Sequence, residues 1–155
     1  MADALRDALQ RATAGRLPGL VGVELLAAAH GEVESRLPLR PELLAPNGYL
    51  HAATVVALAD TSCGMGCIAS LPAEAAGFTT IELKTNFIRT AGAEDVLRCR
   101  AHLVHGGSRT QVWDATVLRE RDEEDVALFR CTQYLLPADD PRTTEQAAKR
   151  AASAE

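Results

Sequence analysis

The chain has 155 residues, of which 47% are hydrophobic and 24% are charged. This length and balance predict one globular domain whose core needs no disulfide or metal to hold it. The net charge of −5 argues against nucleic acid as the main partner. Residues 1–13 lack the apolar core of a signal peptide, and the longest apolar run, residues 52–59, is too short to span a bilayer. We therefore expect a cytoplasmic protein with no membrane partner.

The first third of the chain has the pattern of a helix followed by two strands and a loop. Leucine and alanine recur at helical spacing until Pro18-Gly19 interrupts them, and His30-Gly31 is a turn signal between two strand-like runs. Pro38 cannot donate a ladder hydrogen bond, so we expect the second strand to end at an edge or a bulge. The predicted elements are a helix over residues 2–12, strands over 21–28 and 32–39, and a loop over 40–50.

Residues 51–70 are rich in alanine, valine, leucine and methionine and carry very few charges. The length of this run favours a helix over a strand, and its apolar character predicts burial on most sides. Asp60 is the exception within it. Gly64 and Gly66 weaken the helix but would permit close approach of another backbone.

The second half of the chain alternates apolar and polar residues with the period of strands. Ile81, Leu83, Thr85 and Phe87 share one face of the first run. Short turns join three long runs, which predicts an antiparallel meander. The predicted strands cover residues 80–88, 96–104, 110–119 and 126–136.

These elements predict an α+β domain in which an antiparallel sheet of five or six strands wraps one long central helix, as in the hot-dog fold. We expect residues 1–17 to form a helix that packs on this domain, and residues 18–137 to form the domain itself. Residues 138–155 are predicted to be a tail that is disordered or carries a short helix over 145–152. The four cysteines have no metal-binding spacing and are predicted to be buried.

Asp60 is the first candidate for chemistry. Burying a carboxylate within an apolar helix costs free energy unless the carboxylate is paired, so such a residue suggests a functional role. Burial also raises the pKa of the carboxyl toward that of a general base. The residues alone leave two other readings open: a solvent-facing position, or a hydrogen bond to a nearby hydroxyl such as Thr61.

The start of the same helix is the second candidate. Its first N–H groups have no intrahelical partner and can polarise a carbonyl oxygen. Asn47 and His51 lie beside it, where capping and loop hydrogen bonds are equally reasonable roles. His51 and Asp60 are nine residues apart, roughly 13 Å along a helix. They cannot act on one carbonyl within one chain, but two antiparallel helices related by a two-fold axis would form two equivalent sites in a dimer.

Several of these residues together resemble the active-site signature of PaaI-like hot-dog acyl-CoA thioesterases. The resemblance rests on Asn47, on Gly48-x-x-His51, on Ala-Leu-Ala-Asp60, and on the run Gly77 to Phe87 after the helix. It covers roughly residues 20–136. It implies hydrolysis of an acyl-CoA thioester with no metal and no cofactor, because CoA is part of the substrate, in a homo-oligomer that is at least a dimer and is expected to be a tetramer.

The resemblance also implies roles for single residues. Asp60 would be the base or nucleophile, the Ala52 N–H would polarise the thioester carbonyl, and Asn47 and His51 would hold that region. Thr80 would position the attacking water, with Thr79 as the neighbouring candidate. The residues implied in contact with substrate or CoA are Gly48, Thr61, Thr79, Gly107, Ser108 and Arg109. The last three form a turn whose N–H groups and cation suit phosphate, although it is also an ordinary hairpin turn by its own sequence.

One departure from the family pattern concerns the helix start. The family has His-Gly-Gly, whereas this chain has His51-Ala52-Ala53. Alanine keeps the backbone N–H but adds a methyl where the thioester must approach. This departure keeps open a non-enzymatic acyl-CoA-binding protein as an alternative. A hot-dog 3-hydroxyacyl dehydratase is a second alternative, although a His at the helix start followed by an Asp in mid-helix favours the thioesterase arrangement.

Overall fold

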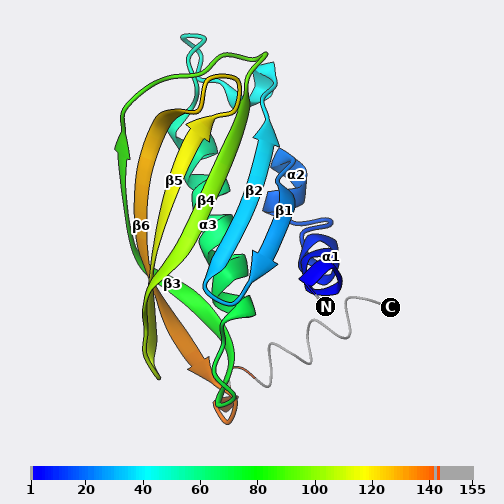
Figure 1. Cartoon of the computed structure of the whole chain (residues 1–155), viewed down its shortest axis with the longest axis vertical. Coiled ribbons are helices and arrows are strands. Elements are labelled where there is room, and N and C mark those ends of the chain that lie inside the picture. The colour runs from blue at the N-terminus through cyan, green and yellow to red at the C-terminus, as the bar shows by residue number, and fades with distance from the viewer. Residues whose placement is uncertain (1, 142, 144–155) are drawn as a thin grey trace.

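A computed structural model describes residues 2–141 and residue 143. It shows one antiparallel six-stranded sheet curved around a central helix (Figure 1). The helices are α1 (Ala2–Ala12), α2 (Leu17–Val21), the short 3-10 helix η1 (Pro41–Leu43) and α3 (Ala52–Ala69). The strands are β1 (Glu24–Ala29), β2 (Glu32–Pro38), β3 (Ala75–Phe87), β4 (Val96–Gly106), β5 (Thr110–Arg119) and β6 (Glu124–Pro137). The tail helix predicted over 145–152 lies outside the described residues.

The strands are ordered β1-β2-β4-β5-β6-β3 across the sheet. The predicted meander of three strands is confirmed for β4, β5 and β6, and β3 pairs with β6 at the sheet edge. The chain therefore crosses the sheet between β3 and β4. Pro38 does not lie on an edge strand, because β2 pairs with both β1 and β4. It is the last residue of β2, where the ladder ends and a missing donor costs little.

The N-terminal residues differ from the prediction in one detail. Residues 17–21 form the short helix α2, with Pro18 in its first turn, and β1 therefore starts at Glu24 rather than at residue 21. α1 lies beside β1 (Figure 1). There the Gln10 side chain donates to the Val23 carbonyl and accepts from the Leu25 N–H at 3.1 and 2.6 Å, so it satisfies backbone groups at the open edge of the sheet.

The apolar segment predicted to be a buried helix is α3. By length and hydropathy alone, the whole of α3 could cross a bilayer, although the shorter apolar run of residues 52–59 could not. In the fold, the sheet wraps α3 (Figure 1), and Leu58, Ala59, Cys63 and Cys67 are completely buried against the strands. The apolar sequence of α3 is therefore explained by its place in the core.

Gly64 and Gly66 permit close approach, but of aromatic rings rather than of another backbone. A Cβ atom at Gly64 would lie 2.8 Å from the Phe78 ring, and one at Gly66 would lie 2.5 Å from two ring atoms of Trp113. Trp113 is fully buried and its indole N–H donates to Gln111 at 2.9 Å, so the ring cannot easily move away.

We expect Gly66→Ala to destabilise the fold by about 1–3 kcal/mol through overpacking, less the roughly 1 kcal/mol that alanine gains over glycine in a helix. Gly64→Ala should cost less, because Phe78 is only partly buried and can shift. Urea denaturation of both variants checks this order. Equal stabilities of the two variants would contradict it.

Candidate active site

Asp60 lies on the half-buried side of α3 that faces β3. Its Oδ1 accepts a hydrogen bond from Thr80 Oγ1 at 3.1 Å, so Thr80 rather than Thr61 supplies the hydroxyl partner. Burial raises the pKa of Asp60 above its ordinary value, and the hydrogen bond from Thr80 offsets part of that rise. A carboxylate with these properties holds a proton more readily than a surface aspartate, as a general base requires.

A β-bulge positions Thr80. The register between β3 and β6 shifts between Thr80 and Glu82, so Ile81 is the extra residue. Thr80 points to the interior face, whereas the adjacent Thr79 is exposed on the opposite face. The structure thus brings Thr80 to Asp60 and keeps the alternative candidate, Thr79, away from it.

The start of α3 has a capping side chain and an N–H group without an intrahelical partner. His51 is the N-cap of α3, and its Nδ1 accepts from the Ala53 N–H at 2.9 Å. The Ala52 N–H carries no hydrogen bond to any of the residues that the structure describes. Ala52 is also exposed, so this N–H is open to a ligand from outside the chain.

The loop before α3 is exposed and shaped by its own hydrogen bonds. Asn47 Oδ1 accepts from the Tyr49 N–H at 3.2 Å, and Gly48 has a φ of +84°, which favours glycine. The loop is tied to the helix at one carbonyl, that of Leu43, which accepts from Thr54 Oγ1 at 2.7 Å. Asn47 thus has the loop role left open by the sequence, and its side-chain amide group faces solvent.

The two halves of the predicted site do not meet within one chain. Asp60 lies two and a half turns along α3 from the N-cap residue His51, roughly 13 Å by helix rise. Thr61 follows Asp60 and is half-buried on the same helix. Within one chain, therefore, no carbonyl can contact both the Ala52 N–H and the Asp60 carboxylate.

The predicted CoA-binding turn joins β4 and β5. Its Gly107 N–H donates to the Thr110 carbonyl at 2.9 Å, and the Arg109 carbonyl accepts from the Leu135 N–H at 2.8 Å. Leu135 lies two residues from Gln133, which pairs with Thr80, so the turn is at the same end of the sheet as Thr80. Ser108 and Arg109 are exposed and line a hollow of about 410 Å³ that also contains Glu74 and Asp139.

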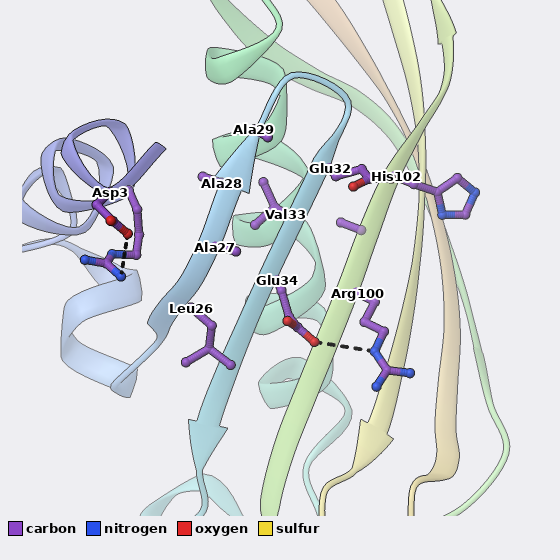
Figure 2. A pocket seen from close by; sticks show the side chains of 12 residues that line it. Asp3, Leu26, Ala27, Ala28, Ala29, Glu32, Val33, Glu34, Arg100 and His102 are labelled. Carbon is purple, nitrogen blue, oxygen red and sulfur yellow. Dashed lines mark hydrogen bonds and ion pairs between the residues drawn. The ribbon is translucent and has the colours of Figure 1, made fainter. Parts of the chain in front are cut away.

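A further hollow, of about 450 Å³, lies on the outer face of β1, β2 and β4 beside α1 (Figure 2). Alanines form much of its wall, and the ion pair between Glu34 and Arg100 crosses it. It contains none of the predicted site residues. In the described part of the chain, no group of three or more His, Cys, Asp or Glu residues is arranged to hold a metal ion. All four cysteines are free thiols, and their predicted burial is confirmed.

A model of the thioesterase superfamily matches residues 47–126, from the loop before α3 to the start of β6, which is just over half of the chain. The chain belongs to the thioesterase superfamily. The acyl-coenzyme A thioesterase PaaI of Escherichia coli is 26% identical over 110 residues, which are 71% of this chain and 75% of that protein.

Solved structures confirm the predicted hot-dog fold of this thioesterase. The PaaI protein of the E. coli phenylacetic acid degradation operon has a TM-score of 0.77 at 19% identity, covering 88% of this chain and 96% of that one. A hypothetical thioesterase of Streptococcus pneumoniae, solved with coenzyme A, has a TM-score of 0.68 at 20% identity, covering 75% and 87%. The PaaI-like resemblance found in the sequence is therefore confirmed, and the protein is a thioester hydrolase.

Sequence reasoning missed one residue beside Asp60. Gln133, on β6, is fully buried, and its Oε1 lies 2.9 Å from Thr80 Oγ1. A signal was present: Gln133 alternates with Cys131 and Leu135 on the buried face of the strand, where a polar residue needs a partner. Only the pairing of β3 with β6 shows that this partner is Thr80.

Proposed function

We propose that this thioesterase hydrolyses acyl-CoA at sites shared by two subunits, with Asp60 of one subunit and the Ala52 N–H of the other acting on one thioester. The observation that carries this is the separation of a half-buried carboxylate, paired with Thr80, from an unbonded N–H at the start of the same helix. Acyl-CoA is supported by the E. coli relative, an acyl-coenzyme A thioesterase, and by the streptococcal neighbour with coenzyme A. The exposed cation Arg109 at the Thr80 end of the sheet suits the CoA phosphates.

The edge strand β3 supports a second subunit. β3 pairs with β6 on one side, and no described strand pairs with its other side. Its apolar side chains are exposed in the single chain, with 58% of Ile81, 43% of Leu83 and 51% of Phe87 accessible. Unpaired backbone groups and exposed apolar side chains at a sheet edge favour association with another chain. We therefore propose that a second copy of this chain covers the edge. The minimum unit is then a dimer, and a tetramer of two dimers is the expected state.

In the reaction we propose, Asp60 accepts a proton from water while the water oxygen bonds to the thioester carbon. The carbonyl oxygen becomes an oxyanion, which the partner subunit's Ala52 N–H stabilises together with the positive end of α3. The intermediate then breaks its C–S bond, and the thiolate of CoA takes the proton from Asp60. If Asp60 attacks directly, an anhydride forms first, and water then cleaves it to the same products.

Mixing two inactive variants tests whether the site is shared. Asp60→Asn and Ala52→Pro each remove one half of the site, but a mixed dimer holds one site in which both halves are native. After dissociation and re-association of equal amounts, thiol release from acyl-CoA should recover to about a quarter of the native rate, because half of the dimers are mixed and each has one good site of two. No recovery, with mixed dimers demonstrated by tag pull-down, would show that Asp60 and the partner's Ala52 N–H do not act on one thioester.

A further inference from the structure

Gln133 is a fully buried polar residue beside Thr80 that the proposed reaction does not use. It lies opposite Thr80 in the β3–β6 ladder, and the bulge at Ile81 keeps Thr80 on its side of the sheet. Its Oε1 is 2.9 Å from Thr80 Oγ1, and its Nε2 is 3.3 Å from the Sγ of Cys131. These side chains thus form a hydrogen-bonded series from half-buried Asp60 and Thr80 to buried Gln133 and Cys131.

The number of available protons restricts the directions of the hydrogen bonds among Asp60, Thr80 and Gln133. The Thr80 hydroxyl has one proton but two neighbouring oxygens, Asp60 Oδ1 at 3.1 Å and Gln133 Oε1 at 2.9 Å. An ionised Asp60 only accepts, so Thr80 must give its proton to Asp60. Gln133 can then bond Thr80 only by turning its amide and donating from Nε2, which occupies the same volume as Oε1. When Asp60 is protonated, it can donate to Thr80, and Thr80 can donate to Oε1.

The surroundings allow Gln133 to turn, in contrast to its neighbour Gln111. A cysteine sulfur is both a weak donor and a weak acceptor, so Cys131 can bond either end of the Gln133 amide. Gln111 pairs with Gln133 across β5 and β6, but its Nε2 donates to the Ser70 carbonyl at 2.8 Å and its Oε1 accepts from the Trp113 N–H at 2.9 Å. Both of those partners have a fixed polarity, so the Gln111 amide is locked.

We propose that Gln133 is a positioning residue: its amide donates to Thr80, which directs the Thr80 proton to ionised Asp60. This rests on the proposed role of Asp60 as the base. Removal of the Gln133 donor leaves the Thr80 hydroxyl free to rotate, so the negative form of Asp60 loses stabilisation. Among the residues that the structure describes, the Cys63 thiol is a titratable group that Asp60 influences, and it stays neutral because neighbouring Cys131 and burial raise its pKa.

The test compares Gln133→Met with Gln111→Met. Both variants remove a fully buried amide from neighbouring strands, but only Gln133→Met removes a hydrogen-bond partner of Thr80, which contacts Asp60. The Asp60 carboxyl is titrated by carbon-13 NMR, with Asp60→Asn identifying its signal, and the acid limb of kcat/KM is measured in parallel. We expect Gln133→Met to move both to higher pH and to lower turnover several-fold on that limb, whereas Gln111→Met moves neither.

Further variants make the result decisive. Gln133→Glu keeps the shape of the side chain but adds an acceptor and a negative charge, so it should shift the Asp60 titration upward more than methionine does. In a Thr80→Val background, Gln133→Met should have no effect on that titration. An unchanged titration in Gln133→Met and Gln133→Glu, or a shift to lower pH in Gln133→Met, would overturn the proposal. Full turnover by Asp60→Asn would instead refute the proposed function. The NMR titration would still show whether Gln133 stabilises ionised Asp60.

Discussion

Replacement of Asp60 by asparagine is expected to lower the turnover of acyl-CoA by about 100-fold or more, the usual contribution of a general base. Asparagine has the same shape and can still accept from Thr80, so the loss would be chemical rather than structural. The measurement is release of free CoA thiol from a panel of short, medium, long and aryl acyl-CoAs. Asp114→Asn is the matched control, because Asp114 pairs with Arg130 away from Asp60 and its removal should leave turnover unchanged.

The same variant should be more stable than the native protein at neutral pH. The pKa of Asp60 is raised in the folded state, so its contribution to stability is fully present at low pH and is lost as the pH rises through the folded-state pKa. Asparagine cannot ionise and avoids this loss. We expect a Tm a few degrees higher at neutral pH and no difference under acid conditions, measured by calorimetry. Turnover of the native enzyme should fall as the pH drops through the same pKa, since protonated Asp60 cannot accept a proton.

If Asp60→Asn turned over every acyl-CoA at the native rate, Asp60 would be neither base nor nucleophile. If neither it nor the native protein released thiol, while acyl-CoA still bound, the protein would be a non-catalytic acyl-CoA-binding member of the superfamily. Ala52-Ala53 in place of Gly-Gly would then be the first suspected cause.

The second large effect is expected from Ala52→Pro, which removes one backbone N–H and little else. Ala52 is the first residue of α3, where proline is well tolerated, and His51 has the extended backbone (φ −72°, ψ 133°) that a residue before proline prefers. Loss of an oxyanion donor costs about 100- to 1,000-fold in kcat. We expect a loss of that size with an unchanged Tm.

Ala52→Gly is the control for this prediction, because glycine keeps the N–H and restores the residue of the family pattern. We expect it to retain turnover, and to raise it for acyl groups that the Ala52 methyl obstructs. Native turnover by Ala52→Pro, with native stability, would show that another donor polarises the carbonyl.

The α+β class, the buried central helix and the long strands could be predicted from sequence because they depend on local patterns. The run of residues 51–70 is apolar apart from a few polar side chains and the single charge of Asp60, and its length favours a buried helix; two-residue alternation indicates which face of each strand is buried. Asp60 and the helix start were identifiable for the same reason: a carboxylate in an apolar run and a loop that ends at a helix are local features.

Only the tertiary structure determines which strands pair and which side chains lie next to each other. The sequence does not reveal that β3 pairs with β6 across the sheet rather than with β4, because strand order depends on non-local packing. Nor does it reveal the bulge at Ile81, which turns Thr80 rather than Thr79 toward Asp60 and brings Gln133 within reach. The residues with potential chemistry were thus identifiable from local sequence, but their hydrogen-bond partners were set by a register that only the folded sheet determines.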